Sequence, residues 1–199
     1  MSAPSVDPAG LQRLNALPAE LARQELLACC SSARWAAEVA SDRPYASAGE
    51  VLARSDESVA GLGQADLEEA LAGHPRIGDR SAAGPPGGAQ AGDGAAAGWP
   101  GQEAGASWSR QEQAGAHAAD PATLQALADG NEAYERRFGH IYLVCATGRS
   151  GAELLALLRQ RLGNEPGTEW DVVRRELGKI NQIRLRKLLN ATNEAGETR

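Results

Sequence analysis

DPATLQALADGNEAYERRFG, residues 120–139, is the stretch that decides the fold class. An aspartate followed by proline is typical of the first turn of a helix. Residues that recur at steps of three and four follow it, which places them on one helical face. They are Leu124, Leu127, Asn131, Tyr134 and Phe138. Gly139 is a common helix terminator, so the stretch predicts an amphipathic helix from Pro121 to just before Gly139.

The same start signals recur in both directions along the chain. Asp7-Pro8 and Pro18 are expected to open two helices, and in the second Leu21, Leu26 and Cys29 are able to face inward. Ser47-x-x-Glu50 and Ser150-x-x-Glu153 have the spacing of capping boxes. The last helix is expected from about Glu169, and the apolar run at residues 141–146 is expected to be a buried extended connector. These signals predict an all-α, single-domain helical bundle over residues 1–199.

Two segments differ in composition from the rest. Residues 80–107 are dominated by alanine, glycine and proline and show no apolar periodicity. Such a run buries too little surface to offset the entropy of ordering it, so we expect a disordered insertion. Residues 191–199 are expected to form a flexible tail.

The composition excludes several classes of function. A hydrophobic fraction of 42% and a charged fraction of 23% are typical of a globular protein. The net charge of −6 argues against nucleic acid as a partner. No stretch has the roughly 18 consecutive apolar residues of a membrane span. Cys29, Cys30 and Cys145 do not suggest a disulfide framework, and no metal-ligand spacing is present. We expect a cytoplasmic protein without metal or cofactor.

Arg184 lies on the apolar stripe of the last predicted helix. It follows Ile180 by four residues and precedes Leu188 by four, so all three share one face. An arginine there can bind a substrate carboxylate or carbonyl through parallel hydrogen bonds. It can equally extend its head to water or pair with a core carboxylate. The pattern leaves both readings open.

His74 and Glu112 are two further candidates. His74 sits between Gly73 and Pro75, where a histidine often does no more than interact with free helix carbonyls. Ser109-x-x-Glu112 is spaced as a capping box, and spacing alone favours that role. A helix start also binds anions, and Ser109 and Gln113 could then add hydrogen bonds. Together an imidazole, a carboxylate and a guanidinium can handle a small anionic substrate by proton transfer.

Several ordered motifs resemble those of one enzyme family. The N-terminal part has Leu14-Asn15-x-Leu17, Trp35 and Arg43-Pro44-Tyr45. The later motifs are His74-Pro75-Arg76-Ile77-Gly78, Ser109-x-x-Glu112-Gln113-x-Gly115, Asn131-x-x-Tyr134-x-x-Arg137-Phe138-Gly139, Gly148-Arg149-Ser150, Arg161-Leu162-x-Asn164 and Ile180-x-x-Ile183-Arg184-Leu185. The chain resembles 2-oxo-4-hydroxy-4-carboxy-5-ureidoimidazoline (OHCU) decarboxylases, which form (S)-allantoin in urate breakdown. The resemblance covers nearly all of the chain except residues 80–107 and the two ends.

The resemblance implies a helical fold, often a homodimer, and a decarboxylation that needs no cofactor. It implies that His74 and Glu112 are catalytic. It also implies that Pro75, Ser109, Gln113 and Arg184 contact the small-molecule substrate. Two alternatives remain: a non-catalytic helical adaptor in which these motifs are merely caps, and a related small-molecule lyase with a different substrate.

Overall fold

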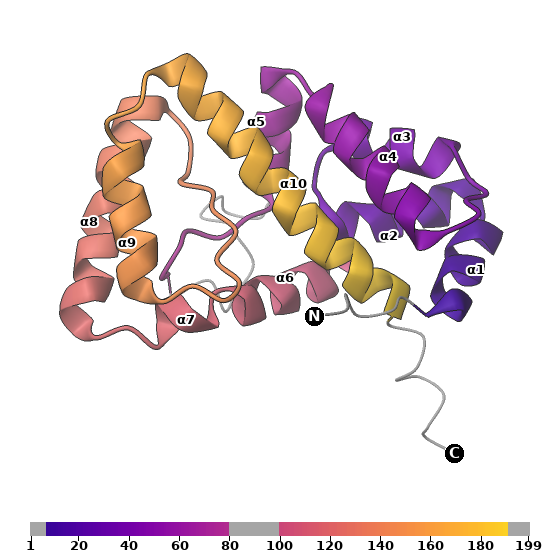
Figure 1. The fold of residues 1–199 in the computed structure, drawn as a ribbon, viewed down its shortest axis with the longest axis horizontal. Coiled ribbons are helices and arrows are strands. Elements are labelled where there is room, and N and C mark those ends of the chain that lie inside the picture. The colour runs from indigo at the N-terminus through magenta and orange to yellow at the C-terminus, as the bar shows by residue number, and fades with distance from the viewer. Residues whose placement is uncertain (1–6, 80–99, 191–199) are drawn as a thin grey trace, which may run out of the picture. The chain divides into compact units, whose positions relative to one another are not determined.

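The computed structural model describes residues 7–79 and 100–190. Those residues form ten helices and no strand, which confirms the predicted all-α class (Figure 1). The helices are α1 (Pro8–Ala16), α2 (Ala19–Cys29), α3 (Ala33–Ser41), α4 (Ala48–Ala60), α5 (Gln64–Ala72), α6 (Pro100–Glu112), α7 (Ala114–His117), α8 (Pro121–Phe138), α9 (Gly151–Arg161) and α10 (Pro166–Asn190).

Local capping signals predicted several helix ends correctly. The Asp120 side chain accepts a hydrogen bond from the Thr123 amide at 3.0 Å and starts α8. The helix stops at Gly139, which has a φ of 78°. Ser150 and Glu153 complete a reciprocal capping box at the start of α9. These signals act within three residues of the helix end, so they can be read without knowledge of the tertiary fold.

Three local predictions differ from the structure. Leu21 is 48% exposed instead of facing the interior, because the buried face of α2 carries Ala22 and Leu26. The last helix begins at Pro166, earlier than about Glu169. The Ser47 hydroxyl caps α4, but the Glu50 carboxylate accepts from the Ala46 amide and not from that of Ser47.

The predicted disordered insertion is wrong at its C-terminal end. Residues 100–107 belong to α6, which runs from Pro100 to Glu112. An apolar stripe is not required along a whole helix when one end is fixed by packing. At the end of α6 the side chains of Ser109 and Glu112 are buried, and so is that of Gln113 just beyond it. Residues 80–99 and 191–199 lie outside the described residues.

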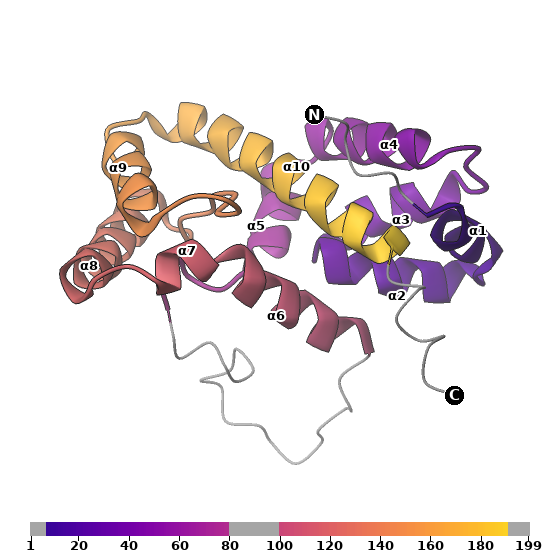
Figure 2. The same ribbon diagram turned by 60° about the horizontal axis from the view of Figure 1, so that its bottom comes forward.

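The chain forms two compact units, and we describe each by itself. Unit 1 contains the described residues up to Ala70 and from Leu177 onward, and unit 2 contains Leu71–Glu176. In unit 1, α3 packs against both α2 and α4. In unit 2, α8 and α9 lie side by side, and α7 also contacts α9 (Figure 2). The prediction of one domain over residues 1–199 stays a prediction.

Residues of the N-terminal motifs form hydrogen bonds at the end of α1 in unit 1. The Arg43 guanidinium donates to the carbonyl oxygens of Leu14 at 2.7 Å and Leu17 at 2.8 Å. The Asn15 amide accepts from the Tyr45 backbone N–H at 3.0 Å and donates to its carbonyl at 2.8 Å. These contacts satisfy carbonyls that a helix end leaves without partners. We therefore assign these motif residues a structural role.

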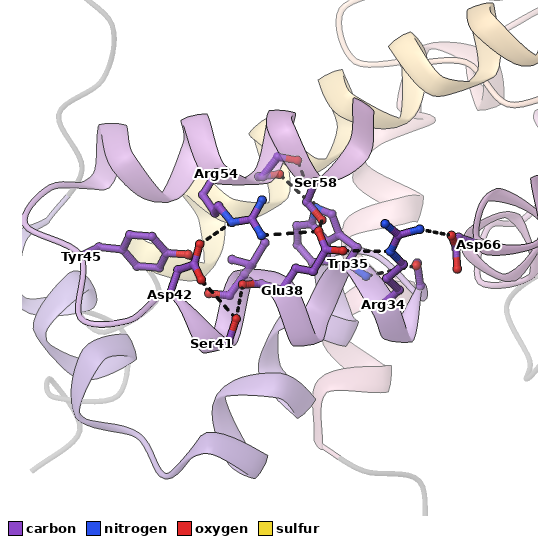
Figure 3. Close-up of polar contacts among 12 residues, drawn as sticks. Arg34, Trp35, Glu38, Ser41, Asp42, Tyr45, Arg54, Ser58 and Asp66 are labelled. Atoms are coloured by element: carbon purple, nitrogen blue, oxygen red, sulfur yellow. Dashed lines mark hydrogen bonds and ion pairs between the residues drawn. The ribbon is translucent and has the colours of Figure 1, made fainter. Parts of the chain in front are cut away.

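A polar network joins α3 to α4 on the outside of unit 1 (Figure 3). Glu38 accepts hydrogen bonds from the Ser58 hydroxyl at 2.7 Å and from the Arg34 guanidinium at 2.8 Å. The Ser58 hydroxyl, followed by Arg34, lowers the pKa of Glu38. On the buried side the Trp35 indole donates to the Ser55 hydroxyl at 3.2 Å. The two helices are thus held by both a core contact and a surface network.

Glu169 is the centre of a buried network in unit 2. It is 0% exposed and accepts hydrogen bonds from the Tyr134 hydroxyl, from Arg161 Nε at 2.7 Å and from Asn164 at 2.7 Å. Burial raises the pKa of Tyr134, so the phenol keeps its proton. Arg161 also donates to the Leu143 carbonyl at 2.6 Å, inside the run at residues 141–146. This run belongs to neither a helix nor a strand and is buried from Tyr142 to Ala146, which confirms the prediction of a buried connector outside a sheet.

Candidate functional site

His74 begins a tight turn that follows α5 in unit 2. Its backbone N–H donates to the Leu71 carbonyl at 3.0 Å, which closes the last turn of the helix. The His74 and Pro75 side chains are half-buried, whereas Ile77 is 5% exposed and anchors the turn in the core. Gly78 has a φ of 81°, a backbone conformation that favours glycine. The sequence His74–Gly78 thus forms a defined turn.

Two buried amide side chains hold this turn. Gln113 Oε1 accepts from the Gly78 N–H at 3.0 Å, and its Nε2 donates to the Pro75 carbonyl at 3.4 Å. Asn131 Nδ2 donates to the Ile77 carbonyl at 2.9 Å. Asn131 therefore has a structural hydrogen-bonding role within the apolar stripe of α8. The amide of Gln113 connects the backbone beside His74 to the backbone beside Glu112.

An ion pair fixes the exposed side of the same turn. The Arg76 guanidinium donates to the two carboxylate oxygens of Glu135 at 2.6 and 2.7 Å. Its hydrogen bonds lower the pKa of Glu135. Glu135 lies four residues after Asn131 on α8, so one face of this helix supplies two of the contacts. That spacing is the signal by which the sequence could have shown the role of Glu135.

Ser109 and Glu112 lie at the C-terminal end of α6, so their predicted role as an N-terminal capping box is wrong. The Ser109 hydroxyl donates to the carbonyl of Gly105, four residues earlier, at 3.0 Å. A serine inside a helix can bond in this way only because the preceding turn is already helical. Ser109 and Glu112 therefore do not lie at the start of α6. Ser109 is 4% exposed and Glu112 is 9% exposed.

Glu112 lies in a charged environment around Cys145. Burial raises the pKa of the Cys145 thiol, and the negative charges of Glu176 and Glu112 act in the same direction. Glu176 is 7% exposed and accepts from the Cys145 backbone N–H at 2.9 Å. Nothing in the sequence pattern indicated Glu176, because its partner is 31 residues away along the chain.

Gly115 lets the motif Ser109–Gly115 pack closely against the motif Gly148–Ser150. A Cβ atom at Gly115 would lie 2.0 Å from the carbonyl oxygen of Arg149, which is far inside the contact distance. Only glycine allows this approach of the two backbones. The motif that contains Glu112 and the motif around Arg149 are therefore in direct contact within unit 2.

Arg184 belongs to unit 1 and is 3% exposed. Burial of the whole side chain excludes the reading in which its head extends to water. Its Nη1 donates to the carbonyl oxygen of Cys29 at 3.4 Å. Leu177, Ile180 and Leu188 are likewise buried, as the stripe predicted. The structure thus gathers Pro75, Gln113 and the segments of His74 and Glu112 in unit 2, and holds Arg184 in the core of unit 1.

No cluster of three or more metal-binding side chains is found among residues 7–79 and 100–190. The same part of the chain contains no helix that is long and apolar enough to cross a membrane. All three cysteines are buried and none forms a disulfide. The candidate residues His74, Glu112 and Gln113 of unit 2 carry an imidazole, a carboxylate and an amide group.

Comparison with known proteins agrees with the motifs. The chain is 29% identical over 175 residues to the uric acid degradation bifunctional protein TTL of Arabidopsis thaliana, covering 86% of this chain. It spans about half, 48%, of that relative's length. It is also 29% identical to the 2-oxo-4-hydroxy-4-carboxy-5-ureidoimidazoline decarboxylase of Amia calva, over 77% of this chain and 79% of that protein.

Solved structures show the same fold. A crystal structure of an OHCU decarboxylase in the presence of (S)-allantoin matches with a TM-score of 0.65 at 24% identity, over 83% of this chain and 97% of that one. A crystal structure of an (S)-allantoin synthase matches with a TM-score of 0.59 at 17% identity, over 89% of this chain and 53% of that one. The family model for OHCU decarboxylase matches residues 15–186. The chain therefore belongs to the OHCU decarboxylase family.

Proposed function

We propose that this protein is a carboxy-lyase that converts 2-oxo-4-hydroxy-4-carboxy-5-ureidoimidazoline into (S)-allantoin and CO₂ without a cofactor. One observation carries the proposal beyond family membership. Gln113, which follows Glu112, bonds to the turn that His74 begins, at the Gly78 N–H (3.0 Å) and at the Pro75 carbonyl (3.4 Å). A fixed spacing between an acid and a base is what proton transfer requires.

The reaction balances with the substrate's own atoms and one proton from solvent. The bond from the ring carbon to the carboxylate breaks, and its electron pair forms a double bond to the carbon that carries the ureido group as CO₂ leaves. The electron pair of the adjacent ring C=N bond moves to the ring nitrogen, which takes up the solvent proton. The hydroxyl group gives up its proton and becomes the ring carbonyl. A proton then adds to the carbon that carries the ureido group. Because the ring accepts the electron pair, the protein needs only to bind, orient and move one proton.

We assign that proton movement to His74, with Glu112 orienting the imidazole. His74 takes the hydroxyl proton as general base, and one of the two groups returns a proton to carbon on a single face. Ser109 and Pro75 contact the substrate beside them. Gln113 holds the turn that carries His74, and its amide also contacts the substrate.

Arg184 is assigned to the substrate's negative charge. A buried guanidinium offers several fixed N–H donors and no acceptor, which suits a carboxylate or a carbonyl that gains charge during the reaction.

The experiment generates the short-lived substrate from urate with two upstream enzymes and follows circular dichroism. This protein should accelerate the appearance of optically active allantoin. Formation of racemic product at the spontaneous rate would reject the proposal and favour the adaptor or a lyase with another substrate. A cytoplasmic homodimer is part of the proposal, and light scattering that gives the monomer mass would reject the dimer.

A further inference from the structure

Asn181 is a buried amide one turn before Arg184 on α10. It is 0% exposed, and within the described chain neither its Oδ1 nor its Nδ2 has a partner in hydrogen-bond geometry. Buried polar side chains nearly always have such partners, because burial removes their bonds to water. An apolar residue of similar shape would serve the packing of this helix better. Asn181 therefore calls for a reason other than stability.

Asn181 lies near two polar side chains of unit 1, those of Arg184 and Cys30. Residues three apart on a helix lie on the same face, so Asn181 and Arg184 are adjacent. Asn181 is close enough to the Cys30 thiol to lower the pKa of that thiol by hydrogen bonding, and the charge of Arg184 acts in the same direction. Burial nevertheless dominates and raises the pKa of Cys30 to about 11. A neutral thiol is a weak hydrogen-bonding group, so it leaves the capacity of the amide largely unused.

The two α10 side chains differ in what they can recognise. Arg184 offers only donors, so it can hold a carboxylate or a carbonyl oxygen but not an N–H group. The carboxamide of Asn181 offers an acceptor and two donors in one plane. A ureido group presents the same combination, so the two can form a pair of parallel hydrogen bonds.

We propose that Asn181 is a specificity residue that binds the ureido group of the substrate beside Arg184. This inference rests on the proposed decarboxylase function. It adds the acceptor for ureido N–H groups that Arg184 cannot supply. A site built to bond an N–H group discriminates strongly against a ligand that lacks it.

The test measures inhibition constants for (S)-allantoin, which carries a ureido group, and for hydantoin, which is the same ring without it. In Asn181→Leu, the constant for (S)-allantoin should rise about tenfold, while that for hydantoin changes less than about twofold. The KM for the substrate should rise with the constant for (S)-allantoin. The Tm should stay the same or rise, because an unpaired buried amide is replaced by an apolar group of similar shape.

Gln182 provides a matched control on the same helix. Its amide donates to the Leu52 carbonyl at 3.0 Å, so Gln182→Leu should lower the Tm and leave both inhibition constants unchanged. If Asn181→Leu does not fold, Asn181→Ser keeps one hydroxyl and should raise the constant for (S)-allantoin about threefold to fivefold.

An unchanged (S)-allantoin constant in an Asn181 variant of an active enzyme would overturn this inference and leave the proposed function intact. An equal rise for both ligands would also overturn it, since the ureido group would not be the contact. If the wild-type protein neither forms nor binds (S)-allantoin, both proposals fall.

Discussion

The Gln113 carboxamide accepts a hydrogen bond from the backbone N–H of Gly78 at 3.0 Å. The two residues are 35 positions apart, and the contact lies between the motif that carries Glu112 and the turn that carries His74. Since Gln113 is 6% exposed, water cannot easily replace it. Gln113 therefore helps to fix the position of the turn, together with Asn131 and the Arg76–Glu135 pair.

Two substitutions of Gln113 should distinguish the effect of its bond to Gly78 from that of its bond to Pro75. In Gln113→Glu the bond to Gly78 is kept, but a carboxylate oxygen faces the Pro75 carbonyl at the 3.4 Å position of the present donor. Gln113→Leu loses both bonds and should destabilise the fold by about 1–3 kcal/mol. We expect kcat/KM to fall at least tenfold in both variants. Urea unfolding and the circular dichroism assay measure the two effects, and normal activity in Gln113→Leu would contradict this role.

The Arg76–Glu135 pair predicts a dependence of stability on pH. The hydrogen bonds from Arg76 lower the pKa of Glu135 from its usual 4.5 in the folded state. The pair therefore stabilises the protein above pH 4.5, and this stabilisation is lost as the pH falls through the folded-state pKa. Arg76→Gln should lower the Tm at pH 7. The loss in the free energy of unfolding should be at most about 1 kcal/mol, since the pair is partly exposed, and the difference in Tm between variant and wild type should vanish at low pH.

Arg136 offers the control for that measurement. It lies on the same helix and is 3.6 Å from Glu132, with side-chain exposures of 71% and 74%. Arg136→Gln should leave the Tm unchanged at every pH. If the Tm of Arg76→Gln stays below that of the wild type at low pH, packing of the arginine stem, and not its charge, holds the turn.

Loss of Glu169 should be the most destabilising single change in unit 2. Its removal leaves the Arg161 guanidinium, which is 6% exposed, without its carboxylate. Uncompensated burial of a charge costs about 3–5 kcal/mol, so Glu169→Ala should lower the free energy of unfolding by that amount. Tyr134→Phe removes one bond to the same carboxylate and should cost about 1–3 kcal/mol. Urea denaturation that ranks the two variants in the opposite order would contradict this network.

Gly115→Ala should disturb the site through the backbone. The new Cβ would lie 2.0 Å from the Arg149 carbonyl oxygen, so one of the two segments must move. Overpacking of this kind costs about 1–3 kcal/mol, and we expect lower activity with it. Gly167→Ala is the matched control, since no atom lies within 4 Å of its added Cβ. Equal Tm values for the two variants would show that the close approach is relaxed in solution.

The sequence allowed the helices to be predicted where local signals decide, as at Asp120, Gly139 and Ser150. It failed at Ser109, because the same serine–glutamate spacing occurs at the end of α6, and packing extends that helix into a segment without an apolar stripe. The sequence indicates Gln113 as a candidate site residue and puts Asn131 on the apolar stripe, but it does not reveal the hydrogen-bonding partner of either amide. Those partners lie 35 and 54 residues away and are brought to them only by the tertiary fold. The sequence did not indicate a role for Asn181, because a single asparagine forms no spacing pattern.

The most direct test of the decarboxylase assignment compares two histidine variants on freshly generated substrate. His74→Asn should lower the rate of (S)-allantoin formation by at least about 100-fold, the usual contribution of a general base. His117→Asn, which changes another partly buried histidine of unit 2, should stay within about twofold of the wild-type rate. Near-normal turnover by His74→Asn, with both variants folded, would contradict the account.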